Sequence, residues 1–147
     1  MFGSIVVGTD GSETAGEAVR QAIELAKAVG AKVNLVSAFQ PVGNQRLREE
    51  RQQVPDDAQW MVNEREDVDA TLKEAGERAE EAGVEVQTFA RQGDPADAIL
   101  DVAEEVGADL IIVGNKGMSG AKRFLLGSVP NKVSHHAPCS VMIIRTT

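Results

Sequence analysis

The sequence has little of what several common kinds of binding site require. A single cysteine, Cys139, excludes an internal disulfide and a thiolate metal cluster. There is no tyrosine, and one tryptophan and four phenylalanines leave few rings on which nucleic-acid bases could stack. Acidic residues outnumber basic ones by 23 to 15, and a net charge of -8 opposes binding to a phosphate backbone. We therefore expect no nucleic-acid partner.

Long apolar runs are also missing. No stretch approaches the roughly 18 residues of a membrane span, and residues 1–4 lead into an apolar segment without a basic start or a cleavage site. These features predict a cytoplasmic protein with no membrane partner. The length of 147 residues, with 42% hydrophobic and 26% charged residues, is typical of one globular domain, which we expect to span residues 1–147.

Strand-like and helix-like segments alternate along the chain. Apolar runs predict strands at 4–9, 32–39, 84–91, 109–113 and 140–146, and helical periodicity predicts helices at 13–29, 60–83, 95–106 and 128–136. The charged, glutamine-rich residues 41–59 form an exposed excursion after the second strand. This alternation predicts an α/β fold: an open, doubly wound, parallel five-stranded sheet with helices on both faces. The first strand should be central, and the alternating third strand should lie at an edge.

Capping residues mark where the helices begin. Ser12 precedes an acidic first turn, and Asp94 precedes Pro95, a residue suited to the first helical position. Ser128 follows Gly127 where the last helix begins. We predict that Ser12, Asp94 and Ser128 are N-cap residues.

A glycine-rich turn follows the fourth predicted strand. It reads Val113-Gly114-Asn115-Lys116-Gly117, and nine residues then separate Gly117 from Gly127-Ser128. Glycines let the backbone approach a ligand closely, and free N–H groups at a helix start can hold phosphate. Lys116, Lys122 and Arg123 add positive charge to this part of an acidic chain. An ordinary glycine-rich turn explains the same residues equally well.

The first strand ends at Gly8-Thr9-Asp10, and ligands of open α/β sheets bind where strand order reverses. Asp10 could accept hydrogen bonds from a ribose hydroxyl or an adenine amine, or hold a metal through water. It could equally be a turn residue that caps the following helix. The residues alone leave both interpretations open.

No catalytic machinery stands out. Ser128 has no His or Asp at a spacing that suggests a triad, so we interpret its hydroxyl as a cap and phosphate donor. His135 and His136 are adjacent, so on a helix they point about 100° apart and do not readily chelate one metal. A P-loop is also missing. We therefore expect binding rather than fast turnover, and we assign no catalytic or metal-ligating residue.

Three segments together resemble the universal stress protein family. They are the spaced glycines Gly114, Gly117 and Gly127-Ser128, the opening at residues 5–12, and the ending at residues 138–144. The similarity runs from about residue 4 to about residue 146 and lacks a counterpart only at about 41–60. It implies a Rossmann-like, adenine nucleotide alpha hydrolase-like fold. It also implies an ATP-binding regulatory or stress-response module with at most slow ATP hydrolysis.

The resemblance also implies a set of site residues. Its adenine and ribose contacts fall on Thr9, Asp10, Ala38 and Val113, and its phosphate contacts fall on Gly114, Lys116, Gly117, Gly127, Ser128 and Val129. The implied cofactor is ATP, which Mg²⁺ could accompany through the phosphates. The implied partner is a second copy, paired through residues 140–146. Gly8 and Lys116 depart from the side chains often found at their positions.

Other functions fit parts of the pattern. The same pocket could serve another adenine nucleotide, such as cyclic AMP or AMP. A phospho-acceptor receiver domain with Asp10 in its acidic site is a weaker candidate, because Gly11 follows Asp10 and residues 88–91 offer no carboxylate. An ATP pyrophosphatase would need a substrate domain for which 147 residues leave little room.

Overall fold

The computed structural model describes residues 2–39, 65–115 and 127–146. Its elements, in chain order, are β1 (Ser4–Gly8), α1 (Glu13–Val29), β2 (Lys32–Phe39), α3 (Arg65–Glu81), β3 (Val86–Gln92), α4 (Pro95–Val106), β4 (Leu110–Gly114), α5 (Ser128–His136) and β5 (Ser140–Ile144). The predicted excursion at 41–59, the predicted helix start at Trp60, and the loop residues Lys116 and Gly117 lie outside the described residues.

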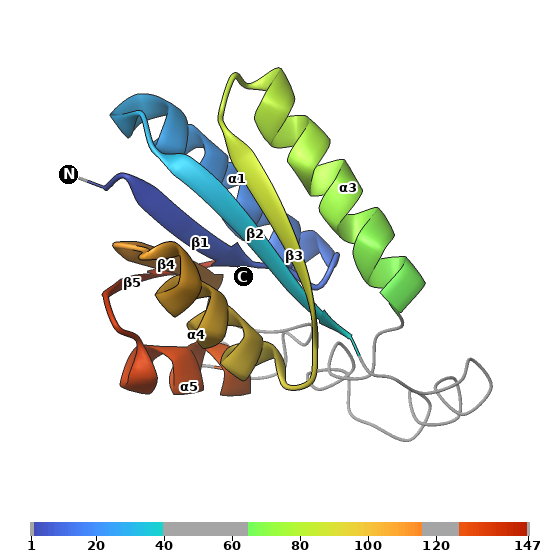
Figure 1. Cartoon of the computed structure of the whole chain (residues 1–147), viewed down its shortest axis with the longest axis vertical. Coiled ribbons are helices and arrows are strands. Elements are labelled where there is room, and N and C mark those ends of the chain that lie inside the picture. The colour runs from blue at the N-terminus through green and yellow to red at the C-terminus, as the bar shows by residue number, and fades with distance from the viewer. Residues whose placement is uncertain (1, 40–64, 116–126, 147) are drawn as a thin grey trace.

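The five strands form one parallel sheet in the order β3-β2-β1-β4-β5 (Figure 1). From β1 the chain moves outward through β2 to β3, and then returns to place β4 on the other side of β1. The expected parallel sheet, the central first strand and the third strand at an edge are confirmed. The direction of winding reverses between β1 and β4, and ligands of open α/β sheets bind at such a point, beyond the carboxyl ends of the strands.

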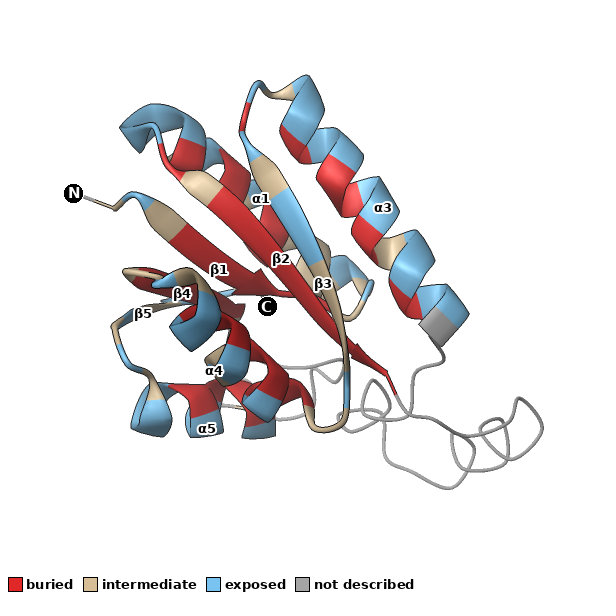
Figure 2. Cartoon of the chain, viewed as in Figure 1, coloured by how far each residue is buried: buried red, intermediate tan, exposed pale blue. Residues whose placement is uncertain are grey.

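Helices cover both faces of the sheet. Ile5, Val7 and Leu35 pack with α1 and α3 in one apolar cluster, while Val6 and Val36 pack with α4 and α5 in a second cluster on the other face. Figure 2 shows β1 and β2 as almost entirely buried. This burial explains why both strands are rich in apolar residues, because each strand packs on both faces, although β2 also buries the polar side chains of Asn34 and Ser37.

Local hydrogen bonds explain where α1 and α4 begin. The Ser12 side chain accepts a bond from the Ala15 N–H at 3.2 Å, and Asp94 Oδ2 accepts one from the Asp97 N–H at 3.0 Å. Both predicted caps are confirmed. Pro95 occupies the first turn of α4, where its missing N–H costs no helical bond.

Two strand boundaries differ from their predicted positions by two residues. The Val84 N–H donates to Ala79 O at the end of α3, so β3 begins two residues after the predicted start. β5 ends at Ile144 rather than at residue 146, because the Thr146 N–H donates to the Asn115 side chain instead of to a strand.

Gly8 has a packing role at the end of β1. A Cβ atom there would lie 2.4 Å from Ile99 Cδ1 and 3.1 Å from Ile99 Cγ1, both closer than normal contact. Ile99, on α4, is buried and has little room to move. The absence of a side chain at residue 8 lets α4 pack directly on the backbone of β1.

We predict that Gly8→Ala lowers the free energy of unfolding by about 1–3 kcal/mol, because the new methyl group overpacks a buried contact. Ile99→Val alone should cost about 0.5–1.5 kcal/mol. In the Gly8→Ala background, the same change removes the closest clashing atom and should cost less, or should stabilise. Urea unfolding of the two single variants and the double variant measures the coupling. Simple additivity of the two effects would show that Ile99 does not restrict residue 8.

Candidate functional site

Residues from distant parts of the chain meet at the carboxyl edge of the sheet. Because β1 lies between β2 and β4, Thr9 and Asp10 lie between Ala38 on one side and Val113-Gly114 on the other. The Thr9 N–H donates to Val36 O at 2.9 Å, which continues the pairing of β1 with β2 beyond Gly8. Thr9, Ala38 and Val113 are buried, whereas Asp10 is partly exposed at this edge.

Asp10 belongs to a tight turn before α1. Its Oδ1 atom accepts a hydrogen bond from the Ser12 N–H at 2.8 Å, and Thr9 Oγ1 accepts one from the Gly11 N–H at 3.2 Å. Gly11 has a φ of 81°, and a Cβ there would lie 2.6 Å from Thr71 Oγ1. The structure therefore shows that Asp10 is a turn residue, as one of the two interpretations proposed, and that its Oδ1 atom stabilises the turn. Oδ2 takes no part in this turn bond and can accept from another group.

The N-terminus of α5 differs from those of α1 and α4. Its N-cap residue is Gly127, and no side-chain cap hydrogen bond is formed. The prediction that Ser128 caps this helix is therefore wrong, because Ser128 is the first helical residue and its side chain is exposed. The Asn131 N–H makes the first intrahelical bond, to Gly127 O at 3.1 Å. Since Pro130 has no N–H, the amides without a helical partner in this turn are those of Ser128 and Val129.

The uncapped end of α5 lies beside the end of β4. The Gly127 N–H donates to Asn115 O at 3.0 Å, and Asn115 directly follows β4. This bond brings the start of α5 to the same sheet edge as Val113 and Gly114. It also joins the two halves of the glycine pattern, although Lys116 and Gly117 lie outside the described residues. Sequence reasoning had assigned no role to Asn115.

A lysine on α5 forms ion pairs with two aspartates at the start of α4. Lys132, about one turn after Ser128, places its Nζ atom 2.8 Å from Asp97 Oδ1 and 3.4 Å from Asp94 Oδ2. The hydrogen bond to Asp97 and the charge of Asp94 raise the pKa of Lys132 above its ordinary value, so the ammonium stays charged. One positive charge thereby offsets part of the negative charge of Asp94 and Asp97 at the start of α4. His135 and His136 occupy the last turn of α5, away from Ser128, where the helix dipole favours cations.

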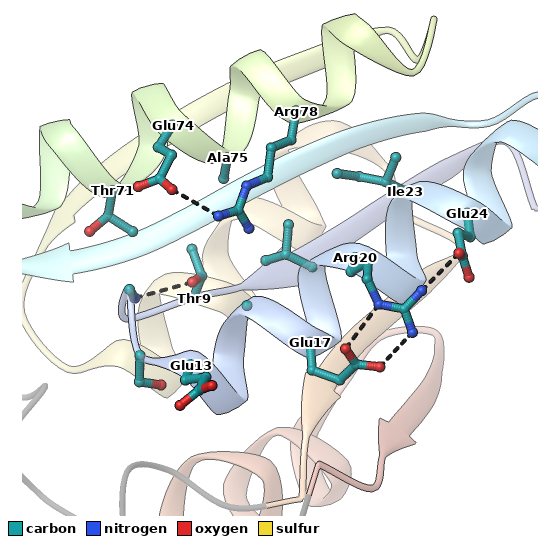
Figure 3. Close-up of a pocket in the computed structure, with 14 residues that line it drawn as sticks. Thr9, Glu13, Glu17, Arg20, Ile23, Glu24, Thr71, Glu74, Ala75 and Arg78 are labelled. Carbon is teal, nitrogen blue, oxygen red and sulfur yellow. Dashed lines mark hydrogen bonds and ion pairs between the residues drawn. The ribbon is translucent and has the colours of Figure 1, made fainter.

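A separate groove of about 600 Å³ lies between α1 and α3, on the face of the sheet opposite to α4 and α5 (Figure 3). Its lining residues are Thr9, Gly11, Ser12, Glu13, Gly16, Glu17, Val19, Arg20, Ile23, Glu24, Thr71, Glu74, Ala75 and Arg78. The groove reaches the turn at residues 9–12, which follows β1, and otherwise lies along the two helices.

The walls of this groove are acidic. Arg20 pairs with Glu17 at 2.6 Å and with Glu24 at 2.8 Å, and Arg78 pairs with Glu74 at 2.8 Å. The hydrogen bond from Arg20 holds the pKa of Glu17 at about 2, with a smaller contribution from Gln21. Because carboxylates outnumber guanidinium groups among its lining residues, the groove disfavours a polyphosphate.

Two further properties concern the described residues as a whole. Within the ranges 2–39, 65–115 and 127–146, no group of three or more His, Cys, Asp or Glu side chains is arranged to hold a metal ion. None of the described helices is long and apolar enough to span a membrane.

The sheet order and the helices on both faces define an α/β protein with a Rossmann-like, adenine nucleotide alpha hydrolase-like fold. The model of the universal stress protein family matches residues 1–145, and the chain belongs to this family. It is 37% identical to universal stress protein Rv1636 of Mycobacterium tuberculosis, over 99% of this chain and 98% of that protein.

Solved structures give the same result. A universal stress protein crystallised in complex with cAMP superposes with a TM-score of 0.72 at 35% identity, covering 99% of this chain and 98% of that one. A universal stress protein from Archaeoglobus fulgidus in complex with dAMP superposes with a TM-score of 0.68 at 27% identity, covering 98% of each chain.

We predict that Asp10→Ala lowers the free energy of unfolding by about 1 kcal/mol, because the Ser12 N–H loses its acceptor. Asp10→Asn keeps an acceptor oxygen in the same place and should lose much less. Thermal or urea unfolding of ligand-free protein measures both effects. Equal losses in the two variants would mean that the charge of Asp10, rather than its turn hydrogen bond, stabilises the start of α1.

Proposed function

We propose that this protein binds ATP in the crevice between the carboxyl ends of β1 and β4, with the phosphates at the N-terminus of α5. The observation that carries the proposal is the missing cap of α5. Side chains cap α1 and α4, whereas α5 has no side-chain cap, and among the described residues the Ser128 and Val129 amides have no helical or side-chain acceptor. Such amides, together with the positive end of the helix dipole, suit an anion.

The conformation of Gly127 supports the same proposal. Its φ of -64° and ψ of 167° are available to any residue, so the backbone does not require glycine here. A phosphate that approaches the peptide closely does favour glycine, because a side chain would occupy its path. Ser128, exposed in the first turn, offers a hydroxyl as a further donor. The proposal extends to the loop residues Lys116 and Gly117 through the family pattern.

The adenosine part would lie nearer to β1 and β2. Thr9, Ala38 and Val113 supply small, buried surfaces at this edge, and Asp10 Oδ2 can accept a hydrogen bond from a ribose hydroxyl or an adenine amine. Any Mg²⁺ would bind chiefly through the phosphates, because the described residues supply no cluster of metal ligands. Phosphate oxygens and water are the ligands that Mg²⁺ commonly keeps.

A regulatory role suits this site better than fast catalysis. The site supplies backbone donors, a serine hydroxyl and one carboxylate, but hydrolysis also needs a positioned water and stabilised transition-state charge. We propose that nucleotide occupancy changes stability or the choice of protein partner, with at most slow ATP hydrolysis.

A second candidate ligand is cyclic AMP or a nucleoside monophosphate. It is favoured by the two similar proteins whose structures hold cAMP and dAMP. The same crevice would bind it, with one phosphate at the N-terminus of α5. Direct competition with ATP separates the two candidates.

We also propose that two copies pair through residues 140–146. β5 is an edge strand of the sheet, and Ile143 is 38% exposed although it is a large apolar side chain. An apolar edge left open to water invites pairing, and a second copy of the same edge would cover it.

The ligand proposal is tested by extracting nucleotide from purified protein and then titrating the emptied protein with ATP, AMP and cyclic AMP. We expect micromolar binding of ATP. Gly127→Asp should raise the dissociation constant for ATP about tenfold or more, because a carboxylate would cap the free amides and repel phosphate. Stability without ligand should stay the same or rise slightly.

Gly127→Ala is the matched control, since it adds a side chain without a cap or a charge. Unchanged ATP affinity in Gly127→Asp would remove the phosphates from this helix end. Tighter binding of cyclic AMP than of ATP would favour the second candidate, and no binding of any nucleotide would contradict the function.

Sedimentation or light scattering tests the pairing of two copies. We expect a dimer that Ile143→Lys converts to a monomer, because a charge at this edge opposes strand pairing. Thr88→Lys, on the other edge strand β3, is the control and should remain dimeric. Dimers of unchanged stability in Ile143→Lys would exclude β5 as the interface.

A further inference from the structure

Asn115 joins three segments at the proposed phosphate site. Its N–H donates to Ile144 O of β5 at 2.8 Å, and its carbonyl oxygen accepts from the Gly127 N–H at 3.0 Å. Its side-chain Oδ1 accepts from both the N–H and the hydroxyl of Thr146, at 2.9 Å and 3.1 Å. One residue therefore links the end of β4, the N-cap of α5 and the segment after β5.

The two backbone bonds determine where α5 begins. The Asn115 N–H extends the pairing of β4 with β5 one step beyond the partners Gly114 and Ile144. The carbonyl of the same residue then holds Gly127, the residue immediately before the free Ser128 amide. The orientation of Asn115 therefore affects the first turn of α5, which carries the Ser128 and Val129 amides.

The side chain of Asn115 holds this orientation. Two donors on Thr146 converge on one oxygen, which restricts the rotation of the side chain and ties residue 115 to a segment 31 residues further along the chain. The residue is partly buried, so these bonds are partly shielded from water. A neutral amide supplies the acceptor without the negative charge that an aspartate would add beside a phosphate.

We propose that Asn115 is a positioning residue for the phosphate-binding end of α5, and that Thr146 acts through it. This inference rests on the proposed function, because it concerns how the same site is held. Asn115 sets the direction of the Ser128 and Val129 amides through Gly127. Phosphate affinity therefore depends on a side-chain contact with the segment that follows β5, which itself belongs to no helix or strand.

The first test compares ATP with adenosine. Asn115→Ala should raise the dissociation constant for ATP about tenfold, equivalent to losing one hydrogen bond to a charged group, and that for adenosine less than twofold. Thr146→Val removes only the hydroxyl donor and should raise the dissociation constant for ATP about threefold. Thr146→Ser keeps a hydroxyl donor, so its dissociation constant for ATP should equal that of the wild type. Ser134→Ala, which removes a side-chain hydrogen bond at the other end of α5, is the control and should change neither value.

The ratio of the two affinities distinguishes positioning from general support of the fold. A general loss of stability would weaken ATP and adenosine equally, and that result, or unchanged ATP binding in Asn115→Ala, overturns the inference. If Asn115→Ala does not fold, the Thr146 variants decide in the same way. Wild-type protein that binds neither ligand overturns the proposed function, whereas wild-type binding with an unchanged variant overturns only the present inference.

Hydrogen exchange of the ligand-free protein gives a readout that does not involve nucleotide. In Asn115→Ala, the amides of Thr146 and Gly127 should both exchange faster than in the wild type, while amides in the middle of α5 should not. In Ser134→Ala, both amides should keep their protection. Full protection of the Gly127 amide in Asn115→Ala would overturn the inference, because the side chain would then have no influence on the start of α5.

Discussion

The rest of the structure depends on the parallel pairing of β1 with β2 on one side and β4 on the other. Residues 5–7 pair with 33–35 and with 110–112, so the center of the sheet is made from three segments far apart in the chain. Because the crossovers from β1 lead one way and the return to β4 leads the other, α1 and α3 cover one face while α4 and α5 cover the opposite face. In open α/β sheets, ligands bind beyond the carboxyl ends of the strands where the direction of winding reverses, which is between β1 and β4 here.

The N-termini of α1, α4 and α5 differ in how their backbone N–H groups are satisfied. A helix start leaves N–H groups without partners, and Ser12 and Asp94 satisfy some of them in α1 and α4. At α5, Asn115 instead binds the N-cap residue from outside the helix and leaves the next amides available. Lys132 offsets part of the negative charge of Asp94 and Asp97 at the start of α4, so an anion at α5 meets less repulsion. Fold and proposed binding thus share one set of hydrogen bonds.

Features governed by neighbouring residues could be predicted from the sequence. The bounds of β2, the caps at Ser12 and Asp94, and the parallel alternation follow from local patterns, and the structure confirms them. The family resemblance supplied the site residues, whose binding roles remain proposals. Features that depend on distant partners were missed: the contact of Asn115 with Thr146 joins residues 31 apart and has no local signal. The prediction for Ser128 was wrong by one residue, because the helix begins at Ser128 and the N-cap position falls on Gly127.

Binding of phosphate at the start of α5 can be tested by recording the amide spectrum of isotopically labelled protein by nuclear magnetic resonance while ATP is added. We expect the amides of Ser128 and Val129 to shift most, because they would point at phosphate. The Ala15 and Asp97 amides, which side chains already satisfy, should shift little. If the largest shifts instead fell along the groove between α1 and α3, around Glu17 and Arg78, ATP would not bind with its phosphates at the N-terminus of α5.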